Sequence, residues 1–150
     1  MFTKLTSEDI QHFKHIVGDT WVSVQQEDLL HYGSDETEDL NFPPEVVIKP
    51  RTPLEIAAIM QWAHARYIPV TPMGARTGLS GGALPVFGGI ALSMERFNRI
   101  LNIDERNLQV TTEPGVITEV LQEAVKAKGL FYPPDPASKG SCFIGGNVSE

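Results

Sequence analysis

Four glycines, two small hydroxyl residues and one arginine are concentrated in the segment Pro72 to Pro85, which contains no acidic residue. Glycine is costly inside a helix or a strand, so this segment is expected to form a loop. Successive backbone N–H groups of such a loop can turn inward and offer partial positive charge to an anion. Because glycine has no Cβ, the main chain can also approach a phosphate closely. The segment therefore predicts a phosphate- or pyrophosphate-binding loop.

The loop matches neither of two familiar phosphate-binding motifs. No lysine follows any of its glycines, as a P-loop requires. The spacing of Gly74, Gly78, Gly81 and Gly82 does not give the Gly-x-Gly-x-x-Gly pattern of Rossmann folds. A glycine-rich loop by itself is equally compatible with a flexible surface loop that binds nothing, so the surrounding motifs have to decide between the two interpretations.

The charge distribution favours an anion at this loop. The chain has 150 residues, enough for one domain with a core, and a formal net charge of -7. An acidic chain is a poor candidate for general nucleic-acid binding, so we expect no nucleic-acid partner. No Asp or Glu occurs between Ile56 and Met94, whereas Arg66 and Arg76 lie there. The glycine loop is therefore expected to lie in a region of positive potential.

The single cysteine, Cys142, cannot form an intramolecular disulfide, which is typical of a reducing compartment. Residues 1–18 are charged and lack the apolar core of a signal peptide. No apolar run is long enough to span a bilayer. We expect a cytoplasmic protein, and peripheral association with the inner membrane remains open.

The apolar pattern predicts an α/β chain with one clear βαβ unit. Thr52 and Glu55 form a capping box around Pro53, and Ile56, Ile59, Met60 and Ala63 then repeat with helical spacing. A strand precedes this helix and another follows it, so the two strands should be parallel. The glycine loop would then leave the carboxyl end of a parallel strand, where ligands bind in open α/β sheets.

The other elements are predicted from capping, alternation and breaker residues. A helix is expected over 6–17, with a cap at Thr6 and Asp9 and a stop at Gly18. The acidic run Asp35 to Asp39 is interpreted as a surface turn rather than a metal site, because no histidine has matching spacing. Strands are expected at 21–24, 45–49, 68–71 and 89–93, a hairpin at 100–103 and 108–112, a helix from 117 to 124, and irregular backbone at 132–136.

Four segments now stand in a fixed order. They are Pro-Glu-Val-Val at 44–47, the glycine loop at 72–82, Glu-Pro-Gly-Val at 113–116, and Pro-Asp-Pro-Ala-Ser-Lys-Gly-Ser-Cys-Phe-Ile-Gly-Gly-Asn at 134–147. Together they resemble the PCMH-type FAD-binding domain of the FAD-linked oxidases, the vanillyl-alcohol oxidase and p-cresol methylhydroxylase type. Within that family the chain is most similar to the glycolate oxidase FAD subunit and to D-lactate dehydrogenases. The resemblance covers nearly the whole chain from Asp35 onward.

The resemblance implies an α/β (α+β) fold. Its first FAD-binding subdomain would contain the βαβ unit and a mixed sheet flanked by helices, followed by the start of a second subdomain. Residues 1–40 would form an N-terminal helical and extended segment, and 41–150 a truncated, N-terminal part of the FAD-binding domain. We accordingly expect an N-terminal fragment of a longer protein.

The resemblance also implies which residues contact FAD. The glycine loop would hold the pyrophosphate, the segment from Glu113 the adenine and ribose, and the segment from Pro134 the flavin and its ribityl chain. The residues implied are Pro72, Met73, Gly74, Ala75, Arg76, Thr77, Gly78, Ser80, Gly81, Glu113, Pro114, Gly115, Val116, Pro134, Asp135, Ser138, Cys142, Gly145, Gly146 and Asn147.

Non-covalent attachment of FAD is expected, because the glycine loop contains no histidine that could tether it. A tether through Cys142 is the open alternative, against the usual fate of a free cysteine as a small buried residue.

The longer parent would oxidise a small 2-hydroxy acid, of the glycolate or D-lactate type, to the 2-oxo acid. No catalytic or metal-binding residue is assigned, because the residues that serve these roles in the family would lie beyond Glu150. An iron–sulfur or other electron-accepting subunit is the expected partner. The fragment alone should be inactive, hold FAD weakly or not at all, and self-associate. The alternatives are a stand-alone FAD-binding or interaction module without turnover, and a nucleotide-sugar enzyme of the same superfamily.

Overall fold

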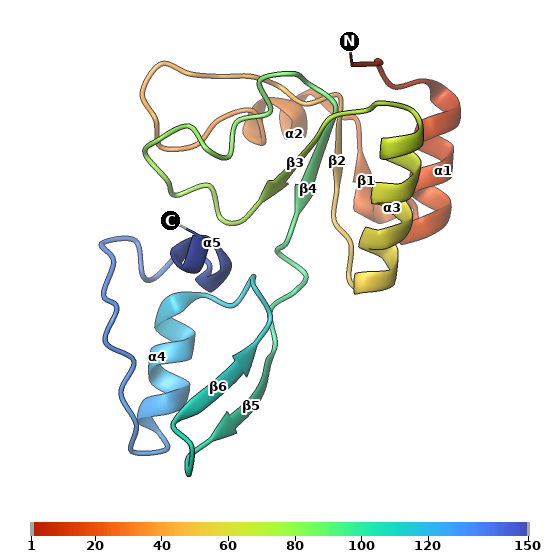
Figure 1. The fold of residues 1–150 in the computed structure, drawn as a ribbon. Helices are drawn as coiled ribbons and strands as arrows, with labels where there is room; N and C mark the ends of the chain where they lie inside the picture. The colour runs from red at the N-terminus through yellow and green to blue at the C-terminus, as the bar shows by residue number, and fades with distance from the viewer. Residues whose placement is uncertain (1, 150) are drawn as a thin grey trace.

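The computed structural model describes residues 2–149 of the chain. They form two bodies, one above the other in Figure 1. The upper body contains a four-stranded sheet with helices on both faces, and the lower body contains a two-stranded hairpin covered by a helix. The structure thus has the expected mixed sheet flanked by helices, followed by a smaller body.

The larger sheet is mostly parallel. Its strands are β1 (Val22–Ser23), β2 (Val46–Ile48), β3 (Val70–Met73) and β4 (Ile90–Ser93), in the order β1-β2-β4-β3. β4 pairs in parallel with both β2 and β3, while β1 is antiparallel to β2. The predicted parallel direction of the βαβ strands is therefore confirmed, although β4 lies between them.

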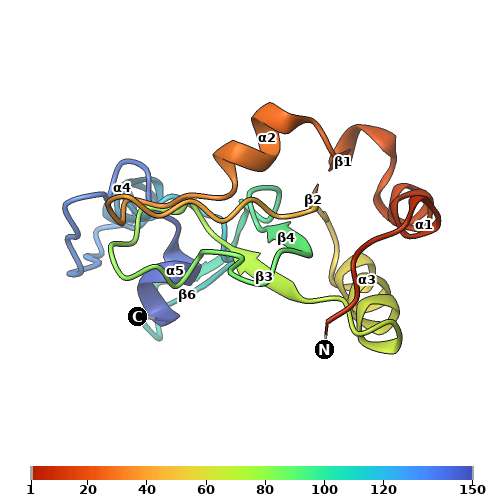
Figure 2. The same ribbon diagram turned by 90° about the horizontal axis from the view of Figure 1, so that it is seen from above.

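The two faces of this sheet are covered by different helices. Val46 and Ile48 pack in one core cluster with α1 (Ser7–Val17) and α3 (Pro53–Ala65), which lie side by side in Figures 1 and 2. Val47 faces the opposite way, toward α2 (Gln26–His31). Each fully buried valine or isoleucine contributes about 1.5–3 kcal/mol of hydrophobic stabilisation. The sequence did not predict α2, a helix of six residues whose N-terminus has no side-chain cap.

Both predicted capping boxes are confirmed. Thr6 and Asp9 cap α1, and Thr52 and Glu55 cap α3. Gly18, with φ 90°, ends α1 as expected. Of the residues that repeat with helical spacing in α3, Ile59 and Ala63 are buried in the core, whereas Met60 is 44% exposed. The apolar face that α3 turns to the sheet is therefore narrower than the spacing predicts.

A buried carboxylate joins α1 to α3 and should make the fold sensitive to acid. Asp9 is 1% exposed, and it accepts a 2.8 Å hydrogen bond from Trp62 Nε1. Burial alone would raise the pKa of Asp9, but the hydrogen bonds from Thr6 and Trp62 and the charge of Arg66 outweigh it and lower the pKa. The unfolded chain therefore takes up a proton before the folded chain does, and the stabilisation disappears as pH falls below about 4.

Replacing Asp9 with asparagine should lower the free energy of unfolding at pH 7 by about 2–3 kcal/mol, the worth of a hydrogen bond to a charged group with its partner left unpaired. Urea titrations at pH 7 and pH 3 measure this difference. At pH 3 the gap between Asp9→Asn and the unmodified chain should shrink, because the unmodified carboxylate is then being protonated. An equal gap at both pH values would show that the charge of Asp9 does not matter.

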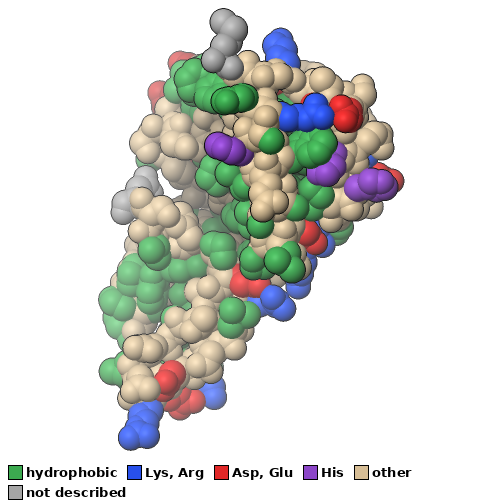
Figure 3. Space-filling model, turned by 45° about the vertical axis from the view of Figure 1, so that its right-hand side comes forward, with side chains coloured by type: hydrophobic (Ala, Val, Ile, Leu, Met, Phe, Trp, Pro, Cys, Tyr) green, Lys and Arg blue, Asp and Glu red, His purple; other side chains and the backbone are tan. Residues whose placement is uncertain are grey.

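The lower body forms around a third core cluster. The hairpin of β5 (Ile100–Asp104) and β6 (Gln109–Thr112) packs on α4 (Thr118–Lys126), and both elements were predicted. The short helix α5 (Ile144–Ser149) was not predicted, since the sequence suggested an irregular tail there. Charged side chains gather at the lower end of the molecule in Figure 3. Lys128 pairs with Glu105 at 3.0 Å.

Two further observations concern the expected strand at 21–24 and the search for a membrane-spanning helix. The expected strand at 21–24 is reduced to β1, because a 3-10 turn (Asp19–Trp21) takes up its first residue. Among residues 2–149, no helix is long and apolar enough to cross a membrane.

Candidate anion-binding site

The glycine loop begins where β3 ends. Pro72 and Met73, which the sequence placed in the loop, belong to the strand, and Met73 is 1% exposed in the core under α2. The irregular backbone starts at Gly74 and leaves the carboxyl end of the parallel strands. The loop therefore occupies the position in the fold that the βαβ prediction gave it.

The backbone donors of this loop are left free by the rest of the chain. Within residues 2–149, no N–H group from 74 to 83 donates a hydrogen bond to a protein atom. The carbonyls of the loop are used instead, since Gly78 accepts from the Glu36 N–H at 3.2 Å and Gly81 from the Leu84 N–H at 3.2 Å. Most backbone donors in a folded protein are paired. A row of unpaired amides on half-exposed backbone is suited to bind an anion with several oxygens.

The loop also leaves room beside its backbone. A Cβ built on Gly78 or Gly82 meets no protein atom within 4 Å. Gly81 has φ +72°, and Arg76 has φ 59°, so two positions of the loop lie in the left-handed region. Only glycine adopts that region without cost. The loop thus leaves open space beside its backbone at Gly78 and Gly82.

Three of the four motif segments meet at this place. A Cβ on Gly74 would lie 3.7 Å from Phe143, and one on Gly145 would lie 2.6 Å from Pro114. Figure 1 shows α5 between the end of β3 and α4. The fourth segment, residues 44–47, runs into β2, and Val46 and Val47 are fully buried in the core.

Most amides of the tail segment, 134–147, are already paired within the chain. The N–H of Cys142 bonds to Ser138 O at 2.7 Å, and that of Gly145 to Pro114 O at 2.8 Å. The carbonyls of the same segment cap α4, because Thr118 N–H donates to Cys142 O at 3.1 Å. The segment therefore serves mainly to hold α4 and α5 together.

Two carboxylates of the implied site already have basic partners. Glu113, 9% exposed, accepts a 2.6 Å hydrogen bond from Arg99, which lowers the pKa of Glu113. Asp135 is exposed and pairs with Lys139 at 2.8 Å, which lowers its pKa as well. Both stay ionised at neutral pH, and their charges are balanced locally.

The two arginines of the acid-free stretch do not supply free charge to the loop. Arg66 pairs with Glu8 at 2.9 Å and Asp9 at 3.3 Å, on the α1–α3 side of the sheet. The Arg76 guanidinium donates to the carbonyl of His31 and lies over the Tyr32 ring. The charge of Arg66 is thus balanced by carboxylates, whereas the guanidinium of Arg76 keeps its charge and is directed at α2.

The thiol of Cys142 is buried, with 2% exposed, and lies 3.2 Å from Thr118 Oγ1. It packs between α4 and α5, as a small apolar residue would. We expect no covalent bond from Cys142 to a bound cofactor. Acid precipitation of the loaded protein should leave a colourless pellet and a yellow supernatant. A pellet that stays fluorescent, and loses this fluorescence in Cys142→Ala, would contradict the prediction.

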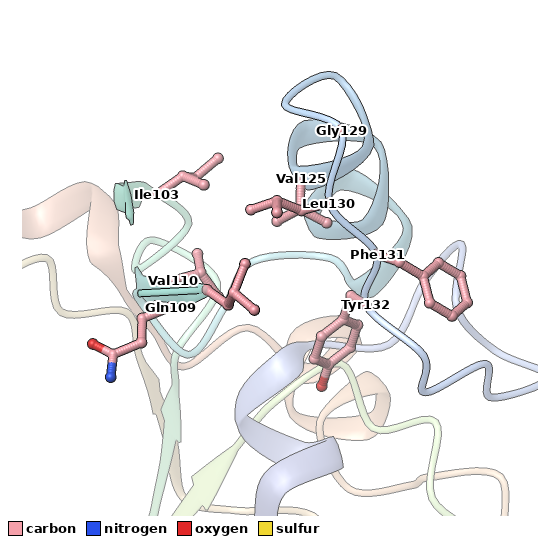
Figure 4. Close-up of a pocket in the computed structure, with 9 residues that line it drawn as sticks. Ile103, Gln109, Val110, Val125, Gly129, Leu130, Phe131 and Tyr132 are labelled. Atoms are coloured by element: carbon pink, nitrogen blue, oxygen red, sulfur yellow. The ribbon is translucent and has the colours of Figure 1, made fainter. Parts of the chain in front are cut away.

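Two hollows of the surface lie away from the glycine loop. One, of about 290 Å³, lies between the hairpin and the end of α4 and is lined by apolar residues including Val110, Leu130 and Tyr132 (Figure 4). The other, of about 380 Å³, lies over α3 and β3 beside Phe87. In residues 2–149, no group of three or more His, Cys, Asp or Glu side chains could hold a metal ion, and 35–39 is a turn.

These features define an α/β domain with unpaired backbone donors, a candidate anion site, at the carboxyl end of its parallel strands. Residues 44–150 match the model of the FAD binding domain family. The chain belongs to this family.

Relatives of known activity agree with this assignment. The chain is 45% identical over 121 residues to glycolate oxidase subunit GlcD of Bacillus subtilis (strain 168), covering 81% of the chain and 26% of the relative. It is 40% identical over 122 residues to D-2-hydroxyglutarate dehydrogenase of Xanthomonas citri pv. viticola, covering 81% and 26%. It is 37% identical over 159 residues to D-lactate dehydrogenase of Anaerostipes hadrus, covering 99% and 31%. The chain thus spans about a quarter to a third of the length of these relatives.

Solved structures share the fold. Alkyldihydroxyacetonephosphate synthase aligns with a TM-score of 0.85 at 18% identity, over 97% of this chain and 32% of that one. p-Cresol methylhydroxylase aligns with a TM-score of 0.75 at 21% identity, over 87% and 27%. The resemblance to the FAD-linked oxidases, and to their glycolate and D-lactate branch, is confirmed.

Proposed function

We propose that the chain binds FAD through its glycine loop, as part of a flavoprotein that oxidises a small 2-hydroxy acid to the 2-oxo acid. The observation that carries this proposal is the row of unpaired N–H groups from 74 to 83, with open space at Gly78 and Gly82. A pyrophosphate has the charge and the several acceptor oxygens that such a row of donors fits. The donor set of the structure therefore fits the cofactor that the family implies.

The residues of this chain would hold and orient the cofactor. The loop amides would bind the pyrophosphate, Glu113 to Val116 would line the adenine and ribose, and the segment from Pro134 to Asn147 would follow the flavin and ribityl chain. Bound flavin supplies the hydride acceptor for oxidation of the hydroxy acid. The names of the relatives support glycolate, D-lactate or D-2-hydroxyglutarate as the substrate class.

Further parts of the proposal concern the organisation and surroundings of the protein. Residues 41–150 are the FAD-binding portion and 1–40 an N-terminal segment, within a longer cytoplasmic protein that passes electrons to a separate acceptor subunit. The isolated chain would be inactive and would self-associate. Its exposed aromatic side chains support this, since Phe87 is 69% exposed and Phe131 is 85% exposed.

The experiment that tests FAD binding compares two ligands by ¹⁵N NMR of the chain, which detects weak binding. FAD should shift the amide signals of Gly78, Gly81 and Gly82, whereas riboflavin, which lacks the pyrophosphate, should leave them in place. Equal responses to both ligands would contradict the proposal, as would a longer gene product containing the chain that binds no FAD. A longer gene product containing the chain should be yellow, and one of the three hydroxy acids should reduce its flavin. A yellow protein whose flavin none of them reduces would favour the FAD-binding module without turnover.

A further inference from the structure

Arg76 holds the glycine loop in a conformation that costs energy. Its φ of 59° lies in the left-handed region, where a non-glycine residue is strained and persists only when its surroundings hold it. The side chain is fixed on α2. Its guanidinium lies 4.4 Å from the centre of the Tyr32 ring and donates to His31 Nε2 at 2.8 Å and to the His31 carbonyl. This contact ties the middle of the loop to the C-terminal end of α2.

Tyr32 is itself held from the other side. It is 5% exposed, and its hydroxyl donates a 2.7 Å hydrogen bond to Glu95 Oε2. Glu95 Oε1 pairs with Lys49 Nζ at 2.7 Å. Lys49 directly follows β2, and Glu95 lies two residues beyond β4. A chain of contacts therefore runs from the strand ends, through one buried ring, to the glycine loop.

The protonation states keep this chain intact near neutral pH. Burial and the hydrogen bond to Glu95 raise the pKa of Tyr32, so its hydroxyl remains a donor. Burial would raise the pKa of Glu95, but the bonds from Lys49 and Tyr32 outweigh it, and Glu95 remains an acceptor. The ring of Tyr32 is thus fixed in place beneath the guanidinium.

We infer that Tyr32 is a positioning residue for the anion site: its ring, braced by Glu95 and Lys49, clamps Arg76 and keeps the loop amides facing outward. Arg76 then acts through the shape of the loop rather than through its charge on the phosphate. The effect of the clamp on FAD binding rests on the proposed function. The contact between Tyr32 and Arg76 is present in the chain without ligand and can be tested there.

The first test needs no ligand. Heteronuclear ¹H–¹⁵N NOE values of the Gly78, Gly81 and Gly82 amides report fast loop motion. They should fall in Tyr32→Leu, which removes the ring, and fall less in Tyr32→Phe, which keeps the ring but loses the hydrogen bond to Glu95. The matched control is Tyr67→Leu, because Tyr67 is 72% exposed and should leave the loop unaffected. Unchanged values in Tyr32→Leu, or an equal fall in Tyr32→Phe, would overturn the clamp.

The second test measures FAD affinity in a double-mutant cycle. Tyr32→Leu and Arg76→Asn should each weaken FAD binding about tenfold, the effect of losing one partly buried cation–π contact. Asparagine tolerates left-handed backbone, so Arg76→Asn removes the clamp without adding strain, and it carries the test if Tyr32→Leu fails to fold.

The double variant should be no weaker than either single variant, because both remove the same contact. Additive losses, or full affinity in Arg76→Asn, would overturn the inference. FAD affinity is measured in the longer gene product that contains the chain. If that protein, unmodified, does not bind FAD, the proposed function fails, while the NOE values of the chain still test the clamp.

Discussion

Replacing Gly78 with valine should weaken FAD binding at least a hundredfold while leaving the free energy of unfolding within about 0.5 kcal/mol of the unmodified value. A side chain at Gly78 should affect FAD binding without affecting the stability of the fold. A Cβ there meets no protein atom within 4 Å, and its φ is outside the left-handed region, so the chain without ligand tolerates a side chain. That free space is the space we assign to the pyrophosphate. Losing one or two charge-assisted hydrogen bonds costs about 3 kcal/mol, which is more than a hundredfold in affinity.

The measurement pairs an FAD titration with urea unfolding of the same preparation. Leu79→Val is the matched control, because Leu79 is 75% exposed, already carries a Cβ, and lies next in the same loop. It should change neither quantity. FAD affinity that is the same in Gly78→Val and in Leu79→Val would mean that the ligand does not approach this backbone.

The features that local chemistry determines could be predicted from the sequence. The capping boxes at Thr6 and Thr52 involve residues three apart, so a short window contains the whole interaction. The glycine loop could be found for the same reason, since the absence of Cβ atoms is visible in the sequence. Its position at the end of a strand followed from the direction of a βαβ unit.

Features that depend on distant parts of the chain could not be predicted. The contact of Arg76 with Tyr32 joins residues 44 positions apart in the sequence. It depends on α2, a helix of six residues that is too short to show a periodic apolar pattern. The helix α5 contains Gly145 and Gly146, which disfavour helices, and it exists because Gly145 docks on Pro114. The insertion of β4 between β2 and β3 is likewise a matter of strand order, which alternation within a strand does not encode.

The joint between the two bodies leads to the prediction with the largest effect on stability. Gly115 lies against the turn that follows β4: its N–H donates to Phe97 O at 2.7 Å, and a Cβ on it would lie 2.3 Å from Met94 O and 2.7 Å from Phe97 O. Both of these are backbone atoms, so no flexible side chain can move aside. Gly115→Ala must therefore displace one body from the other.

The expected cost of Gly115→Ala is about 3 kcal/mol, the upper part of the range for overpacked positions, or a fall in melting temperature of about 6–12 °C for a chain of this size. Gly146→Ala is the matched control: nothing lies within 4 Å of its Cβ, and alanine favours helix α5, so this variant should be as stable as the unmodified chain. The contact of Phe143 with Gly74 also joins the two bodies, so a displacement of one body should disturb it. Gly115→Ala should therefore weaken both FAD binding and stability, whereas Gly78→Val should weaken FAD binding alone. If Gly115→Ala and Gly146→Ala melt at the same temperature, the turn after β4 accommodates the added methyl group at little cost. The contact of Gly115 with this turn would then not determine how the tail segment is placed against the glycine loop.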